Sequence, residues 1–374
     1  MRAVADCHIH IRGGRFQEIE KMLDEVASMG VTEASLLALP FRSVSENLSA
    51  LYWKMNYKKI RLRAFGGLHQ TDRFAYVPYE EQVMKLLELG CDGIKLMDMC
   101  PELRKLNGKG VNHPSYDKMF SLLENKGVPV LMHVNDPREF WEIPDSANCE
   151  DEIIKKGGYI GLGFSAFEDI YSETLQMLDK HPKLKVILAH FFFLADDIGK
   201  AAYVLDTYPN VRFDLTPGWE MFIHFSKNIE EWRKFFIKYS NRILFGTDTN
   251  TYKAFNKEIN QLVYTAITHD ETEFHMPCYG NHVIKGLYLP DDVVDRICYT
   301  NFIEFVGSEI KPVDVEGFYD SAEYILAEMR KNPKDVYYEA GCDIFADLKK
   351  DPEQKTAILF LEQVMKEKRR KGLC

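Results

Sequence analysis

The chain lacks the cysteine spacing and the long apolar runs that mark several classes of protein. Its 8 cysteines among 374 residues form no C-x-x-C pair, so we expect them to be reduced and mostly packed in the interior. No apolar run approaches the roughly 18–20 residues that a membrane helix needs, and no basic segment followed by an apolar stretch opens the sequence. These absences predict a cytoplasmic protein with no membrane segment.

The chain also lacks an excess of positive charge, because 57 Asp and Glu residues outnumber 47 Lys and Arg residues and the net charge is -10 at pH 7. Such a chain is poorly suited to general binding of a phosphate backbone, so we expect no nucleic-acid partner. The one basic run, residues 366–371, favours a helix C-terminus that the macrodipole stabilises over a nucleic-acid patch. With 46% hydrophobic and 28% charged residues, the composition is typical of a globular protein that buries a large core.

No internal repeat, low-complexity tract or Pro/Ser-rich linker divides the sequence. Short apolar runs alternate with stretches of helical period, which is typical of repeated strand–helix units and a parallel sheet. Phe16, Ile19, Leu23 and Val26, for example, recur at three- and four-residue steps. The candidate strands cover residues 3–8, 34–39, 61–67, 92–97, 128–133, 186–191, 211–215 and 243–247. Similar helical patterns cover about 79–89, 115–126, 169–180 and 196–207.

Eight strand–helix repeats in about 300 residues predict a (β/α)8 TIM barrel. A doubly wound open sheet competes, but no G-x-G-x-x-G pattern follows the first strand. We expect the barrel to span residues 1–312, and a helical extension over 313–374 to pack on the barrel or on a second subunit of a homo-oligomer. Two long connections, 135–168 and 249–289, are candidate walls or lids of a site, or else surface decoration.

The first candidate strand ends in His8-Ile9-His10. Alternate residues of a strand point the same way, so the two imidazoles project side by side and can hold one divalent metal ion. Any histidine pair on a strand has this spacing, so the pattern alone is weak. Cys7 directly precedes His8 in this strand, and we interpret it as a small residue packed behind the site rather than as a nucleophile.

Three later strand ends strengthen the pattern, because they finish in His133, His190 and Asp248. Active sites of TIM barrels lie at the C-terminal ends of the strands, so all of these side chains are expected to converge with His8 and His10 at one mouth. The competing interpretation is a set of core histidines satisfied by hydrogen bonds.

With these strand ends the chain resembles the amidohydrolase superfamily, and more narrowly the amidohydrolase-related branch that holds aminocarboxymuconate-semialdehyde decarboxylase, resorcylate-type decarboxylases and several hydrolases. Asp6-Cys7-His8-Ile9-His10 resembles the opening Asp-x-His-x-His of that branch, and Leu188-Ala189-His190 its strand-six motif. Phe245-Gly246-Thr247-Asp248 resembles its Gly-Ser/Thr-Asp motif, and residues 297–305 resemble the Asn-containing helix that closes the barrel. The resemblance covers roughly residues 1–307.

The resemblance implies roles for the strand-end residues. His8, His10, His133 and Asp248 are the implied ligands of one divalent metal, most simply zinc, with manganese or iron as alternatives. Asp248 would also accept a proton from the water that the metal activates, and His190 would act as general base or polarise an oxyanion.

Two further features of the resemblance concern the number of metal ions and the entrance to the site. Lys95 ends strand four, where binuclear relatives carry a carboxylated lysine that bridges two metals. We favour one metal, with Lys95 as a buried or charge-balancing residue. Residues 191–193 are three phenylalanines where many relatives have small residues, which predicts a more apolar or more restricted mouth.

Four residues are candidates for substrate binding, each of which could also be an ordinary loop residue. Arg12, Arg42 and His69 follow the first three strands, where a cation could receive a substrate carboxylate. Trp219 follows strand seven and could stack on a ring.

The sequence thus predicts a metal-dependent hydrolase that cleaves a C–N or C–O bond of a small, carboxylated substrate. A non-oxidative decarboxylase with the same metal site is the first alternative, for which an arginine near the carboxylate would speak. A barrel that binds a ligand without catalysis is the second.

Overall fold

The computed structural model describes residues 2–11, 16–70, 72, 74–142, 158–218, 220–251, 256–269, 274–275, 283–331 and 354–373. Among these, eight parallel strands form one sheet in the order of the sequence. They are β1 (Val4–His10), β2 (Val31–Leu37), β3 (Arg61–Gly67), β4 (Gly93–Met99), β5 (Val130–Val134), β6 (Val186–Leu188), β7 (Val211–Asp214) and β8 (Ile243–Leu244). The ring closes where the Cys7 N–H donates to the Phe245 carbonyl at 3.0 Å and the His10 N–H to the Thr249 carbonyl at 2.8 Å. The predicted (β/α)8 barrel is confirmed.

Only β3 has the predicted bounds, and three of the other strands show differences that bear on the site or the barrel. β1 continues to His10, two residues past its predicted end, so His8 lies within the strand. β2 begins at Val31 instead of residue 34, because Val31 pairs with Val4 across the ladder. β6 ends at Leu188, and His190 belongs to the turn that follows.

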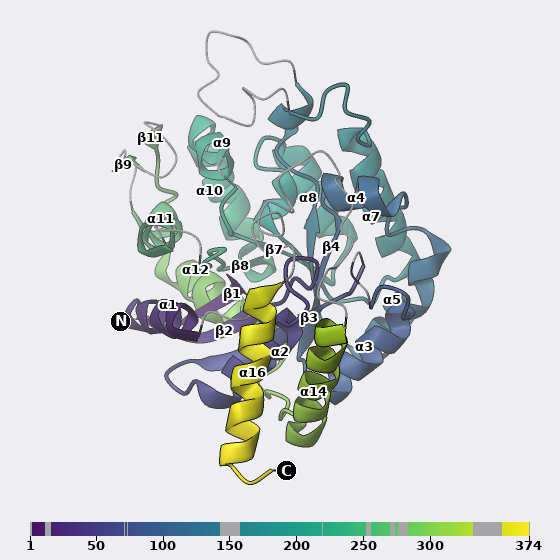
Figure 1. The fold of residues 1–374 in the computed structure, drawn as a ribbon. Helices are drawn as coiled ribbons and strands as arrows, with labels where there is room; N and C mark the ends of the chain where they lie inside the picture. The colour runs from purple at the N-terminus through teal and green to yellow at the C-terminus, as the bar shows by residue number, and fades with distance from the viewer. Residues whose placement is uncertain are drawn as a thin grey trace.

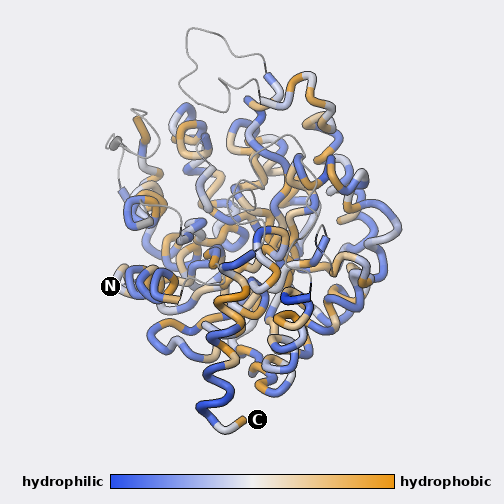
Figure 2. The backbone as a smooth tube through the Cα atoms, in the orientation of Figure 1, coloured by the Kyte–Doolittle hydropathy of each residue, from blue (hydrophilic) through white to orange (hydrophobic). Residues whose placement is uncertain are grey.

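Helices surround the barrel, and apolar segments gather inside it (Figures 1 and 2). They are α1 (Phe16–Ser28), α2 (Glu46–Asn56), α3 (Tyr79–Glu88), α4 (Pro101–Asn107), α5 (Asp117–Lys126), α7 (Phe167–Lys180), α8 (Ile198–Thr207), α9 (Met221–Lys227), α10 (Ile229–Lys238), α11 (Asn256–Thr268), α12 (Asp291–Asp295), α13 (Asn301–Val306), α14 (Val315–Lys331) and α16 (Lys355–Arg370). On α1, the predicted stripe is buried at Ile19, Leu23 and Val26. None of the described helices combines the length and the apolar character needed to cross a bilayer.

The long connection after β5 and the one after β8 are only partly described. Residues 143–157 of the first and residues 252–255, 270–273 and 276–282 of the second lie outside the described residues. The second holds α11 and a short antiparallel pair, β9 (Phe274–His275) with β11 (Val283–Ile284).

Helix α13 plugs the amino end of the barrel. Phe302 and Phe305 pack against Ala5, Leu131 and other inward residues of the strands. The Asn301 side chain donates to the carbonyls of Ser240 at 2.6 Å and Ile243 at 2.8 Å. Among the described residues, α13 therefore closes this end of the barrel, and the pocket described below lies at the other end.

The C-terminal helices α14 and α16 lie side by side against α2 (Figure 1). The ring of Phe360 on α16 stacks on Phe16 with centroids 5.1 Å apart. The Tyr52 hydroxyl on α2 donates to the Glu367 carboxylate at 3.0 Å. This part of the chain is thus attached to the same side of the barrel as β2 and β3.

Candidate metal centre

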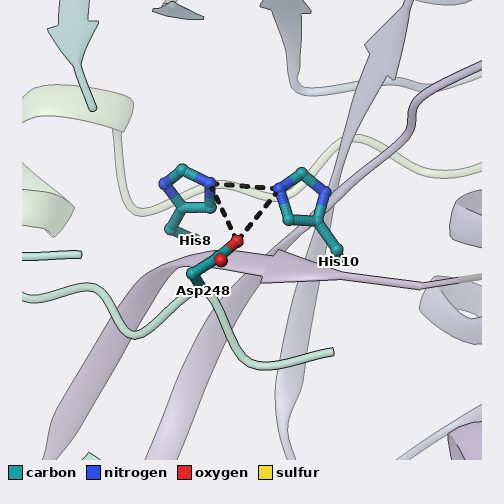
Figure 3. A group of neighbouring side chains, drawn as sticks. All are labelled: His8, His10 and Asp248. Carbon is teal, nitrogen blue, oxygen red and sulfur yellow. Dashed lines mark hydrogen bonds and ion pairs between the residues drawn. The ribbon is translucent and has the colours of Figure 1, made fainter. Parts of the chain in front are cut away.

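Two histidines of β1 and one aspartate after β8 converge at the carboxyl end of the barrel. The Nε2 atoms of His8 and His10 lie 3.1 Å apart. One carboxylate oxygen of Asp248 lies 3.7 Å from the His8 Nε2 and 3.4 Å from the His10 Nε2. Figure 3 shows both rings turned toward this carboxylate. The structure therefore brings together three of the four residues that the sequence offered as ligands.

The second nitrogen of each imidazole identifies its tautomer. The Nδ1 of His8 lies 2.9 Å from the buried carboxylate of Asp214, and the Nδ1 of His10 lies 3.3 Å from the carbonyl of Leu37. Both partners are acceptors, so each Nδ1 carries the proton and each Nε2 presents a lone pair. Burial, against the attraction of Asp248, holds the pKa of His10 well below its ordinary value, which keeps that ring neutral.

Two lone pairs and a carboxylate oxygen facing one another repel unless a cation lies among them. A tetrahedral zinc ion with metal–ligand distances of about 2.0–2.1 Å needs its ligand atoms about 3.3–3.4 Å apart. The separations of 3.1, 3.4 and 3.7 Å surround that value. The donor set, two nitrogens and one carboxylate oxygen, thus fits a divalent metal ion of the zinc type.

His133, the fourth expected ligand, lines the same pocket but has a different partner. Its Nε2 lies 3.3 Å from the carboxylate of Asp136. The Tyr159 hydroxyl bridges Asp136, at 2.5 Å, and Glu102, at 3.0 Å. Cys100 donates to Glu102 at 2.8 Å, and burial raises the pKa of its thiol well above the ordinary value. His133 is therefore the end of a hydrogen-bonded chain that leads away from the other ligands.

His190 lies between His133 and His8, with its ring centroid 4.8 Å from that of His133 and 5.5 Å from that of His8. Its Nδ1 lies 3.2 Å from the Thr216 carbonyl, so Nδ1 carries the proton and Nε2 is an acceptor. Burial, followed by the neighbouring His133, lowers the pKa of His190 well below its ordinary value. The ring is a neutral acceptor, as a general base must be.

The turn that carries His190 is left-handed over four residues. The φ angles of His190, Phe191, Phe192 and Phe193 are 55, 55, 58 and 49°. Only glycine adopts such angles without a penalty, which is of order 1 kcal/mol for each other residue. This explains physically why small residues suit the segment.

Aromatic packing holds the left-handed turn in place. Phe191 stacks on Phe236 at 5.7 Å, and Phe192 meets Tyr171 edge-on at 4.8 Å. Phe193 alone reaches the site, where it stacks on His190 at 5.1 Å. None of the three belongs to the described lining of the pocket, although Phe193 contacts His133 and His190, which do line it.

Asp214, which the sequence analysis did not single out, organises the site from below. One of its oxygens accepts from the His8 Nδ1–H, and the other accepts the backbone N–H of His190 at 2.8 Å and that of Thr216 at 3.1 Å. Asp214 ends β7, so the rule that pointed to the other strand ends would also have found it.

The pocket above these groups has a volume of about 190 Å³ and two cationic side chains in its wall, Arg42 and Lys95. Lys95 is 2% exposed, and its ammonium has no hydrogen-bond partner among the described residues. Burial lowers its pKa to about 8, although Asp214 and Asp248 oppose the shift. Glu46 lies in the same wall and accepts the Leu39 N–H at 2.7 Å.

The remaining candidates for substrate binding have different positions. His69 is not among the described residues that line the pocket, and its Nδ1 pairs with the buried carboxylate of Asp72 at 2.8 Å. Arg12 and Trp219 lie outside the described residues.

The fold and the pocket define a TIM-barrel protein whose histidines and carboxylates gather at the carboxyl ends of the strands. The sequence model of the amidohydrolase family matches residues 56–307, and the chain belongs to this family. This confirms the resemblance to the amidohydrolase superfamily, whose members are metal-dependent enzymes. No curated protein sequence matches the chain.

Solved structures with the same fold share little sequence with the chain. An amidohydrolase II is 15% identical with a TM-score of 0.51, and the match covers 81% of this chain and 99% of that one. The IDCase of Metarhizium anisopliae is 14% identical with a TM-score of 0.49, covering 81% and 97%. A dihydroxybenzoic acid decarboxylase from Polaromonas sp. JS666 with bound manganese is 13% identical with a TM-score of 0.48, covering 82% and 97%.

Proposed function

We propose that this protein is a metal-dependent hydrolase that cleaves a C–N or C–O bond of a small, carboxylated substrate. The observation that carries the proposal is the meeting of two imidazole lone pairs and the Asp248 carboxylate in a pocket whose wall holds two cations. His8, His10 and Asp248 would hold the ion, with His133, which lines the same pocket, as the fourth ligand. Zinc suits this set, and manganese and iron also accept it.

A divalent metal bound there supplies the Lewis acidity that yields a strong nucleophile from water near neutral pH. The residues of the chain do the rest. Asp248 faces the pocket as a carboxylate and can take a proton from attacking water. His190, a neutral acceptor at Nε2, can hold a second proton and return it to the leaving group. Asp214 fixes both His8 and the backbone of His190, so that the base and the ligand keep their relative positions.

The pocket wall supports an anionic substrate. A buried ammonium without a hydrogen-bond partner costs free energy that an anion in the pocket would recover. Lys95 has that property, and Arg42 adds a guanidinium that can bind a carboxylate in a bidentate manner.

One observation favours a non-oxidative decarboxylase as the second candidate. Arg42 lies in the wall of the same pocket as His190 and Asp248, so a carboxylate bound to it could itself be the group that leaves. In that reaction the C–C bond breaks, carbon dioxide departs, and a proton from His190 or Asp248 replaces it on carbon.

The two reactions differ in what becomes of water. Protein loaded with zinc or manganese should be offered a panel of lactones, amides and aromatic acids in ¹⁸O-labelled water, with direct detection of carbon dioxide. We expect a product that carries ¹⁸O and no carbon dioxide. Release of carbon dioxide without ¹⁸O in the product would overturn hydrolysis and establish the second candidate.

A further inference from the structure

The loop between β2 and α2 has two faces. Arg42 and Glu46 line the pocket, whereas Val44, between them, is fully buried on the other side. There Val44 packs with Phe74 of the next loop and with Met329 and Ala357. The last two belong to α14 and α16, so the C-terminal helices form the back of the wall whose front faces the substrate.

The side chain of Gln354 ties this loop to the C-terminal helices by a hydrogen bond. The backbone N–H of Val44 donates to the side-chain carbonyl of Gln354 at 3.0 Å. Gln354 is 2% exposed and directly precedes α16, and its backbone carbonyl accepts the N–H of Ile358 in the first turn of that helix. Its side chain therefore has one end on a rigid helix and the other on the backbone that carries Arg42.

The family match ends at residue 307, before α14 begins. The helices behind the wall are thus an addition of this chain to the part that the family defines. A buried N–H that loses its acceptor is costly, so the loop keeps its path only while Gln354 is in place.

We propose that Gln354 is a positioning residue for Arg42, and that the C-terminal helices complete the substrate pocket by fixing the loop that follows β2. The inference rests on the proposed function in one respect, namely that Arg42 receives the carboxylate of the substrate.

The first test needs no ligand. Hydrogen–deuterium exchange over residues 42–46 should be compared in the wild type, Gln354→Leu and Gln354→Glu. We expect exchange at least about tenfold faster in Gln354→Leu, because the Val44 N–H loses its acceptor, and near wild-type exchange in Gln354→Glu, which keeps an acceptor oxygen. The matched control is Glu367→Leu, which removes the acceptor of the Tyr52 hydroxyl near the other end of α16 and should leave this segment unchanged. Equal exchange in Gln354→Leu and the wild type would overturn the inference.

The second test reads the pocket itself. Metal-loaded protein should be titrated with 2,6-dihydroxybenzoate and with resorcinol, the same ring without the carboxylate. The preference is the ratio of the two dissociation constants. We expect the preference for the carboxylated ring to fall about tenfold in Gln354→Leu and at least as much in Arg42→Gln, and to persist in Gln354→Glu and Glu367→Leu. A general loss of stability would weaken both rings alike and leave the preference unchanged.

The outcomes separate the two proposals. If Arg42→Gln kept the wild-type preference for 2,6-dihydroxybenzoate over resorcinol, Arg42 would not receive the carboxylate, and the proposed substrate class would fail. A preference lost in Arg42→Gln but kept in Gln354→Leu would leave the substrate class standing and overturn the role of the C-terminal helices. The exchange measurement decides that role even if neither ring binds.

Discussion

At the amino end of the barrel a buried charge meets the opposite charge, whereas at the carboxyl end groups of the same kind face one another. Arg63, fully buried, forms an ion pair with Glu33 and donates to the Gly307 carbonyl at 2.7 Å. At the other end the imidazoles of His8 and His10 point lone pairs at each other, and the Lys95 ammonium has no hydrogen-bond partner among the described residues.

The difference distinguishes charged groups that stabilise the fold from charged groups that would bind a ligand. Burying a charge costs several kcal/mol unless a partner compensates it. Glu33 supplies that partner at the amino end, which makes that pair a structural element. Around the pocket, the Lys95 ammonium has no hydrogen-bond partner among the described residues, and the converging nitrogens of His8 and His10 with the Asp248 oxygen suit a cation. An anion and a metal ion are therefore the natural partners of these groups. Substitutions of the ligand-binding groups at the carboxyl end should therefore weaken binding, whereas substitutions at the amino end should lower the free energy of unfolding.

The largest effect is expected at the metal centre. His10→Ala removes one of three converging donor atoms, and we expect it to lose most of the roughly one equivalent of bound metal and at least about 10³-fold in activity. Metal content by mass spectrometry and kcat/KM are the measurements.

The matched control for His10→Ala is His113→Ala, which removes an exposed histidine remote from the pocket. The metal content and kcat/KM of that variant should equal those of the wild type. Full retention of metal in His10→Ala would mean that the site is wrongly assigned.

The second effect belongs to the opposite end of the barrel. Glu33→Gln leaves the buried guanidinium of Arg63 uncompensated, so we expect the free energy of unfolding to fall by about 3–5 kcal/mol. Metal content at a temperature where the variant is folded should equal that of the wild type. Denaturant unfolding measures the first quantity, and a variant that instead lost metal at unchanged stability would contradict the separation of the two ends.

The sequence predicts the carboxyl end better than the amino end, because strand-end residues follow from a pattern of period two and the position of the barrel mouth. His8, His10 and Asp248 meet as that pattern implies. Asp214 was within reach of the same rule, since it ends β7. The pair of Arg63 and Glu33 was not, because it depends on the register between β2 and β3, which no local pattern reveals.

Two features of the site depend on contacts between distant parts of the chain and could not be predicted. Asp136 follows His133 by only three residues, but the onward contacts of Tyr159 with Asp136 and Glu102 join parts of the chain that lie far apart in the sequence. The left-handed turn at residues 190–193 opposes the intrinsic preference of phenylalanine and exists because an aromatic cluster from α7 and α10 encloses it.

The third effect concerns the buried carboxyl group of Glu220, which directly precedes α9. Glu220 is 5% exposed, its carboxylate oxygens have no hydrogen-bond partner among the described residues, and burial raises its pKa to about 8. The folded protein therefore holds this proton more tightly than the unfolded chain, where the ordinary value is 4.5. The contribution to stability is full below that value and is lost as the pH rises toward 8.

Glu220→Gln should remove this loss. We expect the free energy of unfolding of the wild type to fall by up to about 3 kcal/mol between pH 5 and pH 7.5 relative to that of the variant. Urea unfolding of both proteins at several pH values measures the difference. Parallel curves would show that Glu220 is compensated in the folded protein.

The smallest effect concerns the cation that we assign to the substrate. Lys95→Met keeps an apolar side chain of similar length but removes the ammonium, so the KM for a carboxylated substrate should rise about tenfold while kcat changes less. Because burial holds the pKa of Lys95 at about 8, the wild-type KM should also rise as the pH passes that value, and the KM of the variant should not. Steady-state kinetics from pH 6.5 to 9 give both quantities. An unchanged KM in Lys95→Met would mean that the Lys95 ammonium is a structural charge, like the guanidinium of Arg63, and that it does not bind the substrate.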